Sequence, residues 1–326
     1  MIWIRKHTSN PEVTDYYLET IGEAYAKCGE NVRYFIDWKE YNPNNDDITV
    51  ISTYYEALLM ILKRRKFVWW VQGIRPEESF AVHKSHLRKV LLDIAESICI
   101  RKTIFPIFVS EAMRRHYENK YKVKFEKYYV MPCCNDTIKK ESFYAEGKYD
   151  NNIFCYAGSL DTWQCVEEAL MIYKQIEEHC KNTKLLLLVK DRKYAMMLLE
   201  KYKIQNYEID FVPIEELPQK LKEVKFGFII RKNLDLNRVA TPTKLMTYMG
   251  NGVIPIVSDC LDGLIECIGS SKYVVKMSDD LSVKPILECL EKTIAPGDIE
   301  RDYQEVYLKY YDKKMHVQKM MGMLPR

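Results

Sequence analysis

Two cationic residues flank a predicted helix start late in the chain. Arg231 directly follows the apolar run 226–230, and Lys244 closes the segment Thr-Pro-Thr-Lys at 241–244, ahead of a stretch with helical spacing. Proline at a first helical position lacks an N–H group that would have no helical partner there, and threonine is a good N-cap, so we expect the helix to begin at Thr241. The free N–H groups of such a start, beside Arg231 and Lys244, would suit a diphosphate.

The same segment has a simpler interpretation. Thr-Pro is common at helix starts, and a lysine in a first turn is usually solvated, so the motif alone does not establish an anion site. Its surroundings favour one. The segment lies between the apolar runs 226–230 and 253–257, which places the helix start at the carboxyl end of a predicted parallel strand, where open α/β sheets bind ligands.

A second polar cluster follows an apolar run in the first half of the chain. Residues 68–71 read as a buried strand, which is followed by Gln72, Arg75, Glu77 and Glu78. Gln72 could hydrogen-bond a polar ligand, Arg75 could neutralise a phosphate, and either glutamate could act as a general base. The alternative is an ordinary helix start, where the helix dipole favours acidic residues.

Three further residues are candidates for acid-base chemistry or metal binding. His83 and His86 are three apart in a predicted helix over 82–101, so they are expected on one face, either as a metal pair or with His83 as a catalytic histidine. No third ligand has a suitable spacing, so no metal site is predicted, and surface positions are the alternative. Asp15 is a lone carboxylate in the first predicted helix, either a base for an acceptor or a solvated acid.

Short apolar runs alternate with helical patterns along the whole chain. The predicted strands are residues 32–36, 48–51, 67–71, 107–109 and 128–131 in the first half, and 153–156, 185–189, 207–211, 226–230, 253–257 and 273–275 in the second. Amphipathic stretches between the first set cover residues 12–28, 54–64, 82–101 and 111–120. This alternation predicts an α/β protein with two doubly wound, Rossmann-like domains.

The apolar rhythm stops between residues 131 and 152, where the chain is polar and rich in turn-forming residues. We expect the domain boundary there, with domains over residues 1–145 and 146–326. The length of 326 residues agrees with two domains. The tail from about residue 296 is strongly helical in pattern, and its last helices could cross back to the first domain.

Composition narrows the classes of partner and compartment. The net charge of +3 gives no nucleic-acid signature. The ten cysteines show no paired CxxC motif, which favours free thiols in a reducing cytoplasm over zinc or disulfides. No signal peptide and no run long enough to span a membrane is found, so a cytoplasmic location is expected.

One segment joins apolar and basic character. Residues 58–67 combine an aliphatic run with four cations, as membrane-surface elements do. The alternative is a buried helix with a basic last turn, which the helix dipole also favours. A peripheral position at the inner face of the membrane is therefore one possible location.

Four segments together resemble the GT-B glycosyltransferases, and in particular the family-four-like bacterial enzymes that build polysaccharides. They are the strand-to-helix step 108–117, the turn 131–136, the strand-to-helix turn 155–164 and the segment 231–258, which is similar to an Arg…Asn…Ser-Pro-Thr-Lys…Glu-Tyr-x-x-x-Gly pattern. The resemblance covers roughly residues 105 to 260. It implies a GT-B fold with a nucleotide-sugar site in the second domain.

The resemblance assigns roles residue by residue. Arg231 and Lys244 would contact the donor diphosphate, Asn237 would shape the loop, and Thr243 would offer its amide and hydroxyl to a phosphate oxygen. Gly158 would let the backbone pass close to the nucleotide. The full set assigned to donor binding is Gly158, Ser159, Trp163, Arg231, Asn237, Thr241, Thr243, Lys244 and Thr247. Trp163 would stack on the base or pack beneath its loop.

The chain also departs from the family pattern. Thr247 stands where the second Glu of a Glu-x7-Glu motif is usual, and Val239 stands where the first is usual. Ser159 and Gln164 replace the Arg and Lys often found after the first strand of the second domain. Arg231 and Lys244 would then be the cations left to offset the diphosphate charge.

The expected function is transfer of a sugar from a nucleotide-diphosphate-sugar to a saccharide, in particular a lipid-linked polysaccharide precursor. The two cations and the helix start would stabilise the leaving diphosphate without a metal or other cofactor. Whether the reaction retains or inverts the anomeric centre stays open. The alternatives are a catalytically weakened GT-B partner or scaffold protein, and a nucleotide-sugar epimerase-type α/β enzyme.

Overall fold

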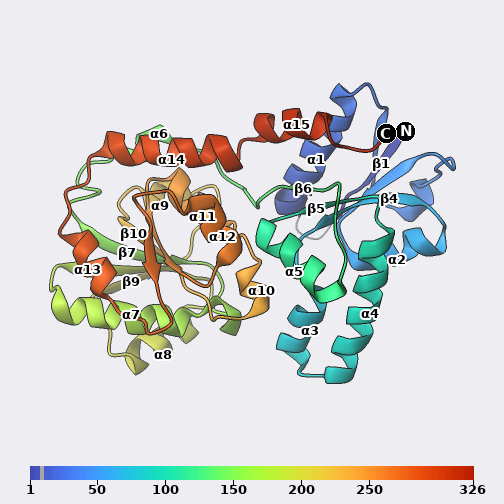
Figure 1. Cartoon of the computed structure of the whole chain (residues 1–326). Helices are drawn as coiled ribbons and strands as arrows, with labels where there is room; N and C mark the ends of the chain where they lie inside the picture. Colours follow the sequence, from blue (N-terminus) through green and yellow to red (C-terminus); the bar gives the residue numbers. More distant parts are fainter. Residues whose placement is uncertain (8–10) are drawn as a thin grey trace. The chain divides into compact units, whose positions relative to one another are not determined.

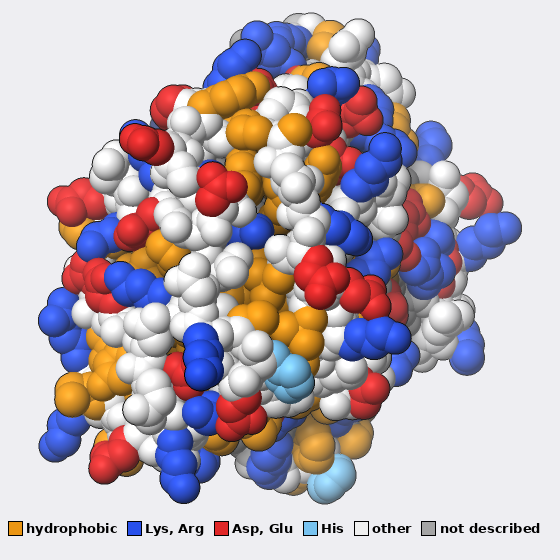
Figure 2. Space-filling view, turned by 90° about the vertical axis from the view of Figure 1, so that its left-hand side faces the viewer, with side chains coloured by type: hydrophobic (Ala, Val, Ile, Leu, Met, Phe, Trp, Pro, Cys, Tyr) orange, Lys and Arg blue, Asp and Glu red, His pale blue; other side chains and the backbone are white. Residues whose placement is uncertain are grey.

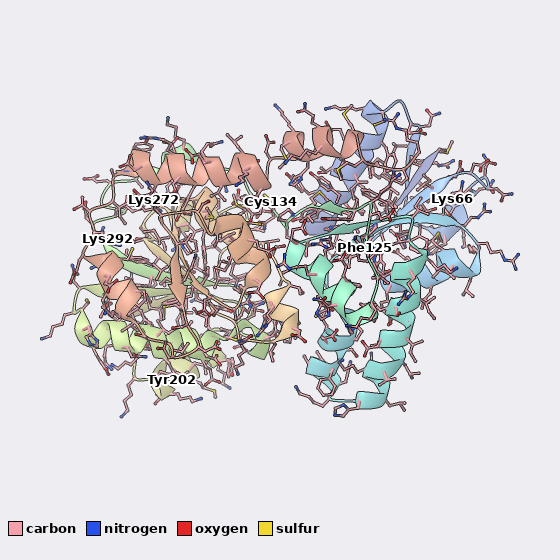
Figure 3. The ribbon with its side chains drawn as sticks, in the orientation of Figure 1. Lys66, Phe125, Cys134, Tyr202, Lys272 and Lys292 are labelled. Carbon is pink, nitrogen blue, oxygen red and sulfur yellow. The ribbon has the colours of Figure 1, made fainter. Side chains whose placement is uncertain are left out.

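The computed structural model describes residues 1–7 and 11–326 (Figure 1). The strands form two six-stranded parallel sheets. Each sheet belongs to its own unit. Unit 1 comprises Met1–Cys133, Arg238–Thr241 and Leu308–Arg326, and unit 2 comprises Cys134–Asn237 and Pro242–Tyr307. Figure 3 labels Cys134, where unit 2 begins, and Lys66, where a strand of unit 1 begins.

The sheet of unit 1 has the strand order β2-β1-β3-β4-β5-β6. Its strands are β1 (Ile2–Arg5), β2 (Val32–Phe35), β3 (Ile48–Ile51), β4 (Lys66–Val71), β5 (Phe105–Phe108) and β6 (Tyr129–Val130). Strands β3 and β5 are buried throughout, as expected for a parallel sheet covered on both faces. Because β1 pairs with both β2 and β3, the strand order reverses at β1.

Helices cover both faces of this sheet. They are α1 (Pro11–Lys27), η1 (Trp38–Glu40), α2 (Tyr54–Leu62), α3 (Arg75–His83), α4 (His86–Lys102), α5 (Glu111–Tyr121) and α15 (Lys313–Met321). Helices α1 and α15 pack together on one face, and α2, α4 and α5 lie on the other (Figure 1). Thr53, Ser85 and Ser110 cap α2, α4 and α5 by accepting a main-chain N–H in the first turn.

The sheet of unit 2 has the order β12-β11-β10-β7-β8-β9. Its strands are β7 (Asn152–Ala157), β8 (Thr183–Leu188), β9 (Tyr207–Asp210), β10 (Phe226–Ile229), β11 (Ile254–Ser258) and β12 (Val275–Met277). The order runs outward from β7 through β8 to β9 on one side, and from β10 to β12 on the other. The carboxyl ends of β7 and β10 therefore form the topological switch point, where such sheets bind ligands.

The helices of unit 2 also lie on both faces of its sheet. They are α6 (Lys140–Phe143), η2 (Thr162–Gln164), α7 (Val166–His179), α8 (Arg192–Lys201), α9 (Leu217–Leu221), α10 (Asp235–Arg238), α11 (Lys244–Gly250), α12 (Asp262–Ile268), α13 (Lys284–Leu290) and α14 (Pro296–Tyr310). The last residues of α14, from Leu308, are assigned to unit 1. Helices α7 and α8 lie on one face, and α11 and α12 on the other (Figure 1).

One tyrosine fixes α11 against the switch point. The Tyr248 hydroxyl accepts the N–H of Ala157 at 3.1 Å. A Cβ at Gly227 would lie 2.6 Å from the Tyr248 ring, so only glycine lets α11 come this close to β10. The start of α11 is thereby held beside the ends of β7 and β10.

The predicted α/β class with two doubly wound domains is confirmed. Each predicted apolar run overlaps a strand from β2 to β12, whereas β1 is a strand that the sequence analysis does not predict. None of the helices in the described part of the chain combines the length and apolar character needed to cross a bilayer. All ten cysteines are free thiols.

The boundary between the two units differs from the expected one at 145/146, because the structure places residues 134–145 in unit 2. The N–H of Lys139 donates to the Gly250 carbonyl at 2.8 Å, and Ser142 Oγ donates to Asn251 Oδ1 at 3.3 Å. These contacts attach the segment to α11. At the other end, residues from Leu308 onward belong to unit 1.

Candidate functional site

Arg231 lies two residues after the end of β10 in unit 2, with only 9 % of its surface exposed. Its main-chain N–H donates to Ser258 Oγ at 2.9 Å. The guanidinium donates to the carbonyl of Ile230 at 2.8 Å, to the carbonyl of Gln164 at 3.0 Å, and to Gln164 Oε1 at 2.6 Å. These bonds fix the guanidinium at the carboxyl end of β10.

Lys244, the first residue of α11, shares the same acceptor. Its Nζ donates to Gln164 Oε1 at 3.1 Å and lies 4.4 Å from the centre of the Tyr156 ring. Burial, with a smaller contribution from the Arg231 charge, lowers the pKa of Lys244 to about 7. Within the described residues, neither cation forms an ion pair with a carboxylate. Two cations therefore converge on one neutral amide oxygen, an arrangement that an anion would stabilise.

A cavity of about 520 Å³ adjoins this pair within unit 2. Its walls come from the ends of β7, β8 and β9 and from the first turn of α11. They are Ala157, Gly158, Ser159, Leu188, Lys190, Phe211, Val212, Pro213, Ile214, Leu217, Thr243, Lys244 and Thr247. The wall after β9 is apolar and suits a flat ring, while the Lys244 side suits phosphate groups.

Gly158 lets the backbone after β7 pass close to the ammonium group. Its φ of +137° lies in a region that side chains rarely adopt. A Cβ at this position would lie 2.9 Å from Lys244 Nζ and 3.1 Å from Lys244 Cε. The glycine thus leaves the space that the lysine side chain uses.

We expect Gly158→Ala to weaken binding of a nucleoside diphosphate about tenfold, because the methyl group displaces Lys244 and the backbone is strained. Isothermal titration calorimetry measures the loss. Gly297→Ala is the matched control, since its Cβ would meet only Tyr144 Oη at 3.5 Å. Equal affinities in both variants would contradict the assigned role of Gly158.

The expectation that the helix begins at Thr241 is wrong. The helix begins at Lys244, with Thr243 in the N-cap position and making no side-chain capping bond. The Thr241 hydroxyl instead accepts the N–H of Cys133 at 3.1 Å within unit 1. The first turn is tightened by a bond from Leu245 N–H to the Pro242 carbonyl, so the regular helix starts later than the sequence pattern indicates.

The other donor residues named from the resemblance have distinct surroundings in unit 2. Asn237 is buried and donates to the Lys232 carbonyl at 2.8 Å, which closes the loop after β10. Ser159 is exposed and donates to Asp161 Oδ2 at 2.7 Å. The Trp163 side chain is 51 % exposed, so it is not packed beneath its loop and is open to stacking.

The two positions that lack the family glutamates lie in different units. Thr247 lines the cavity of unit 2. Its main-chain N–H donates to the Thr243 carbonyl, and its carbonyl accepts Nδ2 of Asn251. Val239 is 3 % exposed in unit 1, where its carbonyl accepts Ser110 Oγ at 2.7 Å. Of Thr247 and Val239, only Thr247 lines the cavity.

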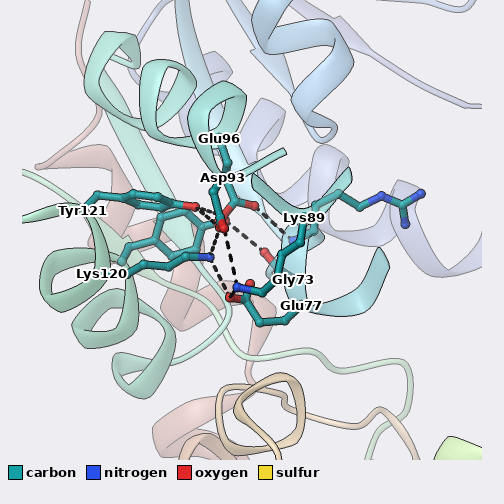
Figure 4. A network of polar contacts seen from close by, with 9 residues as sticks. Gly73, Glu77, Lys89, Asp93, Glu96, Lys120 and Tyr121 are labelled. Carbon is teal, nitrogen blue, oxygen red and sulfur yellow. Dashed lines mark hydrogen bonds and ion pairs between the residues drawn. The ribbon is translucent and has the colours of Figure 1, made fainter. Parts of the chain in front are cut away.

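Of the polar residues after β4, Glu77 belongs to a network of hydrogen bonds and ion pairs in unit 1 (Figure 4). Glu77 Oε1 pairs with Lys120 at 2.7 Å and Lys89 at 3.2 Å, so its carboxylate is already neutralised. Gln72 and Arg75 are exposed, and Arg75 lies 3.6 Å from Glu78.

Glu78 has the more suitable surroundings for a base. Burial raises the pKa of its carboxyl group, and the Arg75 charge opposes the rise. Its carboxylate lies over Gly73, where a Cβ would meet Oε1 at 2.0 Å. Of the two candidate glutamates, Glu78 is thus the one that has no lysine partner in the part of the chain that the structure describes.

The expectation that His83 and His86 share one helix face is wrong. His83 is the last residue of α3 and His86 the first of α4, and between them Lys84 adopts φ 53°. Both imidazoles are exposed, and His86 contacts the Phe80 ring. Asp15 in α1 pairs with Lys6 at 3.1 Å. No group of three His, Cys, Asp or Glu side chains suited to a metal occurs among the described residues.

The sequence analysis misses a cluster at the ends of β1 and β3 in unit 1. His7 Nε2 lies 3.2 Å from Glu56 Oε1 and 3.1 Å from Ser52 Oγ. Burial would raise the pKa of Glu56, but hydrogen bonds from His7 and from the main chain of Ser52 and Thr53 hold it below its usual value. The capping-box pattern Thr53-x-x-Glu56 is the sequence signal that could have pointed to this cluster.

In unit 2 the sequence analysis misses the shared acceptor and two walls of the cavity. Gln164 appears there only as a departure from the family pattern, whereas its amide positions both cations. Lys190 and the run 211–214 also line the cavity. The sequence indicates them only by their position, because Lys190 lies two residues after β8 and the run follows β9.

Comparisons with known proteins establish the fold. The sequence matches no family model and no curated protein. Sucrose-phosphate synthase from Thermosynechococcus elongatus superposes with a TM-score of 0.71 at 13 % identity, over 99 % of this chain and 98 % of that one. HepE from Anabaena in complex with UDP gives 0.68 at 12 % identity, over 99 % of both chains.

TarM of S. aureus, in complex with fondaparinux, α-GlcNAc-glycerol and UDP, gives a TM-score of 0.65 at 11 % identity, over 87 % of this chain and 56 % of that one. These neighbours are GT-B glycosyltransferases. The predicted resemblance in fold to the GT-B enzymes is therefore confirmed, and the chain has the two-domain GT-B architecture.

Proposed function

We propose that this chain is a GT-B glycosyltransferase that transfers a sugar from a nucleotide-diphosphate-sugar to a saccharide acceptor. The observation that carries the proposal is the convergence of Arg231 and Lys244 on Gln164 Oε1, at the switch point of unit 2 and beside the 520 Å³ cavity. Two cations without a carboxylate partner in the described residues suit the diphosphate of such a donor.

The cavity supports a binding mode for the rest of the donor. The apolar wall formed by residues 211–214 and Leu217 would cover the base. Gly158 would face the phosphates, with Lys190 at the rim. Neighbouring structures were solved with UDP, so a uridine donor is the first candidate.

The chemistry follows from the charges. As the glycosidic bond to the diphosphate breaks, negative charge grows on the leaving oxygen, and Arg231 and Lys244 would stabilise it with fixed donors. Two positive side chains can offset this charge, so the proposed reaction is metal-independent. If the reaction inverts the anomeric centre, Glu78 is our candidate base on the acceptor side, with Gln72 and Arg75 as acceptor contacts.

The proposed acceptor is a lipid-linked saccharide presented at the cytoplasmic face of a membrane. The resemblance to polysaccharide-building enzymes supports this choice. It is tested by offering the protein, with a donor, free oligosaccharides and lipid-linked ones, and by comparing product formation.

Thr247→Ala is expected to keep kcat/KM within about tenfold of the parent, a loss below ~1.4 kcal/mol. The main-chain bonds of Thr247 are kept in alanine, and its side chain adds no charge to the cavity. Initial rates with a nucleotide-sugar measure the effect. If transfer were abolished while nucleotide binding stayed intact, Thr247 would be a group that contacts the reacting sugar, contrary to our view.

The proposal is tested first by a thermal-shift panel with UDP, GDP, CDP and ADP. A ligand that binds only the native state stabilises it by RT ln(1 + [L]/Kd), so one nucleotide should raise the melting temperature more than the others. Product analysis with the matching sugar nucleotide then separates the alternatives. Free nucleoside diphosphate indicates a transferase, an isomer of the donor indicates an epimerase, and binding without turnover indicates a scaffold protein.

A further inference from the structure

A stripe of apolar side chains runs along the outward side of α4 in unit 1. Leu87, Val90, Leu91, Ile94 and Ile98 follow the i, i+3, i+4, i+7 spacing of a helix face and are 73 %, 53 %, 60 %, 55 % and 45 % exposed. At about 100° per residue they fall on one side of the helix, and we call these five residues the α4 stripe. Contiguous exposed aliphatic side chains of this kind mark an interaction surface.

The inner side of α4 carries its acidic residues. Asp93 pairs with Lys120 at 2.5 Å and with Lys89 at 3.4 Å (Figure 4). Glu96, which is 1 % exposed, accepts the Tyr121 hydroxyl at 2.7 Å and the N–H of Arg75. The helix is thus turned with its carboxylates toward α3 and α5 and its aliphatic side chains toward solvent.

The exposed polar residues of α4 carry no negative charge. They are His86, Arg88, Arg101 and Lys102. By helical spacing, Lys102 and Arg88 lie beyond the Leu91 edge of the α4 stripe. The Arg101 guanidinium instead donates to the Tyr121 carbonyl of α5. On the face drawn in Figure 2, by contrast, cationic and anionic side chains are intermixed. The outward side of α4 therefore combines apolar character with positive charge only.

We propose that the α4 stripe docks on an anionic membrane surface. Its aliphatic side chains would enter the boundary between headgroups and acyl chains, while Arg88 and Lys102 beside it would meet anionic headgroups. A second copy of the chain fits less well. A two-fold dimer would place this face against itself and bring Arg88 and Lys102 of both copies together without acidic partners.

Membrane docking through α4 does not depend on the sugar chemistry. It replaces the membrane contact that the sequence pattern suggested for residues 58–67. In α2 and the basic residues 63–66 that follow it, only Leu62 of the aliphatic residues is well exposed, at 80 %. Lys63 there is occupied over the rings of Trp38 and Tyr41. A single exposed leucine offers far less apolar area than the α4 stripe.

The test is co-sedimentation of the full chain with vesicles of neutral lipid and with vesicles in which about a third of the lipid is phosphatidylglycerol. We expect binding to the anionic vesicles that weakens at high salt. The pair L91S/I94S should lower the partition at least about tenfold, and R88Q/K102Q should lower it several-fold. Melting temperatures should stay close to the parent, because all four side chains are exposed.

The matched control is M196S/M197S on α8 of unit 2, where both methionines are 57 % exposed. It should bind vesicles like the parent. Absence of binding to anionic vesicles, equal binding to neutral ones, or unchanged binding of L91S/I94S would overturn the proposal. A dimer in sedimentation velocity that L91S/I94S dissociates would assign the α4 stripe to a second copy and overturn it as well.

Discussion

Replacing Lys244 with methionine is expected to lower kcat/KM for the nucleotide-sugar donor by about 10²- to 10³-fold. Removing one preorganised donor from a developing oxyanion typically has an effect of this size. Methionine keeps an unbranched side chain over the Tyr156 ring, so the packing is largely retained. Because burial beside Arg231 disfavours the ammonium form, the variant should melt no lower than the parent. Nucleoside diphosphate release measures the rate.

Lys190→Met is the matched control for this experiment. Lys190 lines the same cavity but is exposed, and its charge is screened by solvent. We expect a change below about threefold. Arg231→Ala is a poorer test, because Arg231 is 9 % exposed and its removal leaves the carbonyl of Gln164 without a donor. A Lys244→Met variant as active as the Lys190→Met variant would refute the role of Lys244.

Donor binding is expected to take up a proton and to weaken as the pH rises above 7. Burial lowers the pKa of Lys244 to about 7 in the free protein, and a bound diphosphate would raise it again. Below pH 7 the lysine is already charged, so affinity should be flat. Above it, the association constant should fall by up to tenfold per pH unit, or about a hundredfold between pH 7 and 9.

Calorimetry at pH 8 in two buffers with different heats of ionisation measures the proton uptake directly. A donor sugar nucleotide is the right ligand, because a terminal phosphate itself titrates near pH 6. The neighbouring thiol of Cys155 does not interfere, since burial raises its pKa to about 12. Lys244→Met should bind without pH dependence. Proton uptake that persists in this variant would assign the effect to another group.

In the absence of ligand, the free energy of unfolding should rise with pH, whereas the affinity for the donor falls. The unfolded chain binds a proton on this lysine below its ordinary pKa of 10.5, whereas the folded protein binds it only below about 7. Between these pH values the unfolded state binds more protons than the folded state, so the free energy of unfolding increases as the pH rises. Lys148, whose pKa burial also lowers to about 7, contributes in the same direction.

The fold was predictable because parallel strands buried on both faces are continuous apolar runs. Residues 185–189 and 226–230 show this directly, and both become strands. The strand order was not predictable from such runs. The pairing of β10 with β7, far apart in the chain, depends on packing such as the stacked rings of Phe154 and Phe226.

The candidate site was predictable only in part. Arg231 and Lys244 both follow from the strand-loop-helix pattern that places them at the end of β10. Their shared acceptor Gln164 lies 67 and 80 residues away in sequence, and no local pattern connects it to them. From the sequence, Gln164 was noted only as an uncharged residue at a position where the family often has a cation.

The break between α3 and α4 shows a second limit. Lys84 turns the chain with φ 53°, a conformation that glycine usually supplies, so the sequence reads as one continuous helix. An amphipathic pattern also does not say which side packs inward. In α4 the acidic side packs inward and the aliphatic side faces solvent, because Lys120 and Tyr121 of α5 supply partners for Asp93 and Glu96.

The central claim is that Arg231 and Lys244 bind the diphosphate of a nucleotide donor, and it is tested most directly by titrating UDP and uridine into the parent and into Lys244→Met. The parent should bind UDP far more tightly than uridine. In the variant, UDP binding should weaken by ~1.5–3 kcal/mol, the range of a charge-assisted hydrogen bond, while uridine binding stays unchanged. Equal losses for both ligands, or no loss for UDP, would contradict the account.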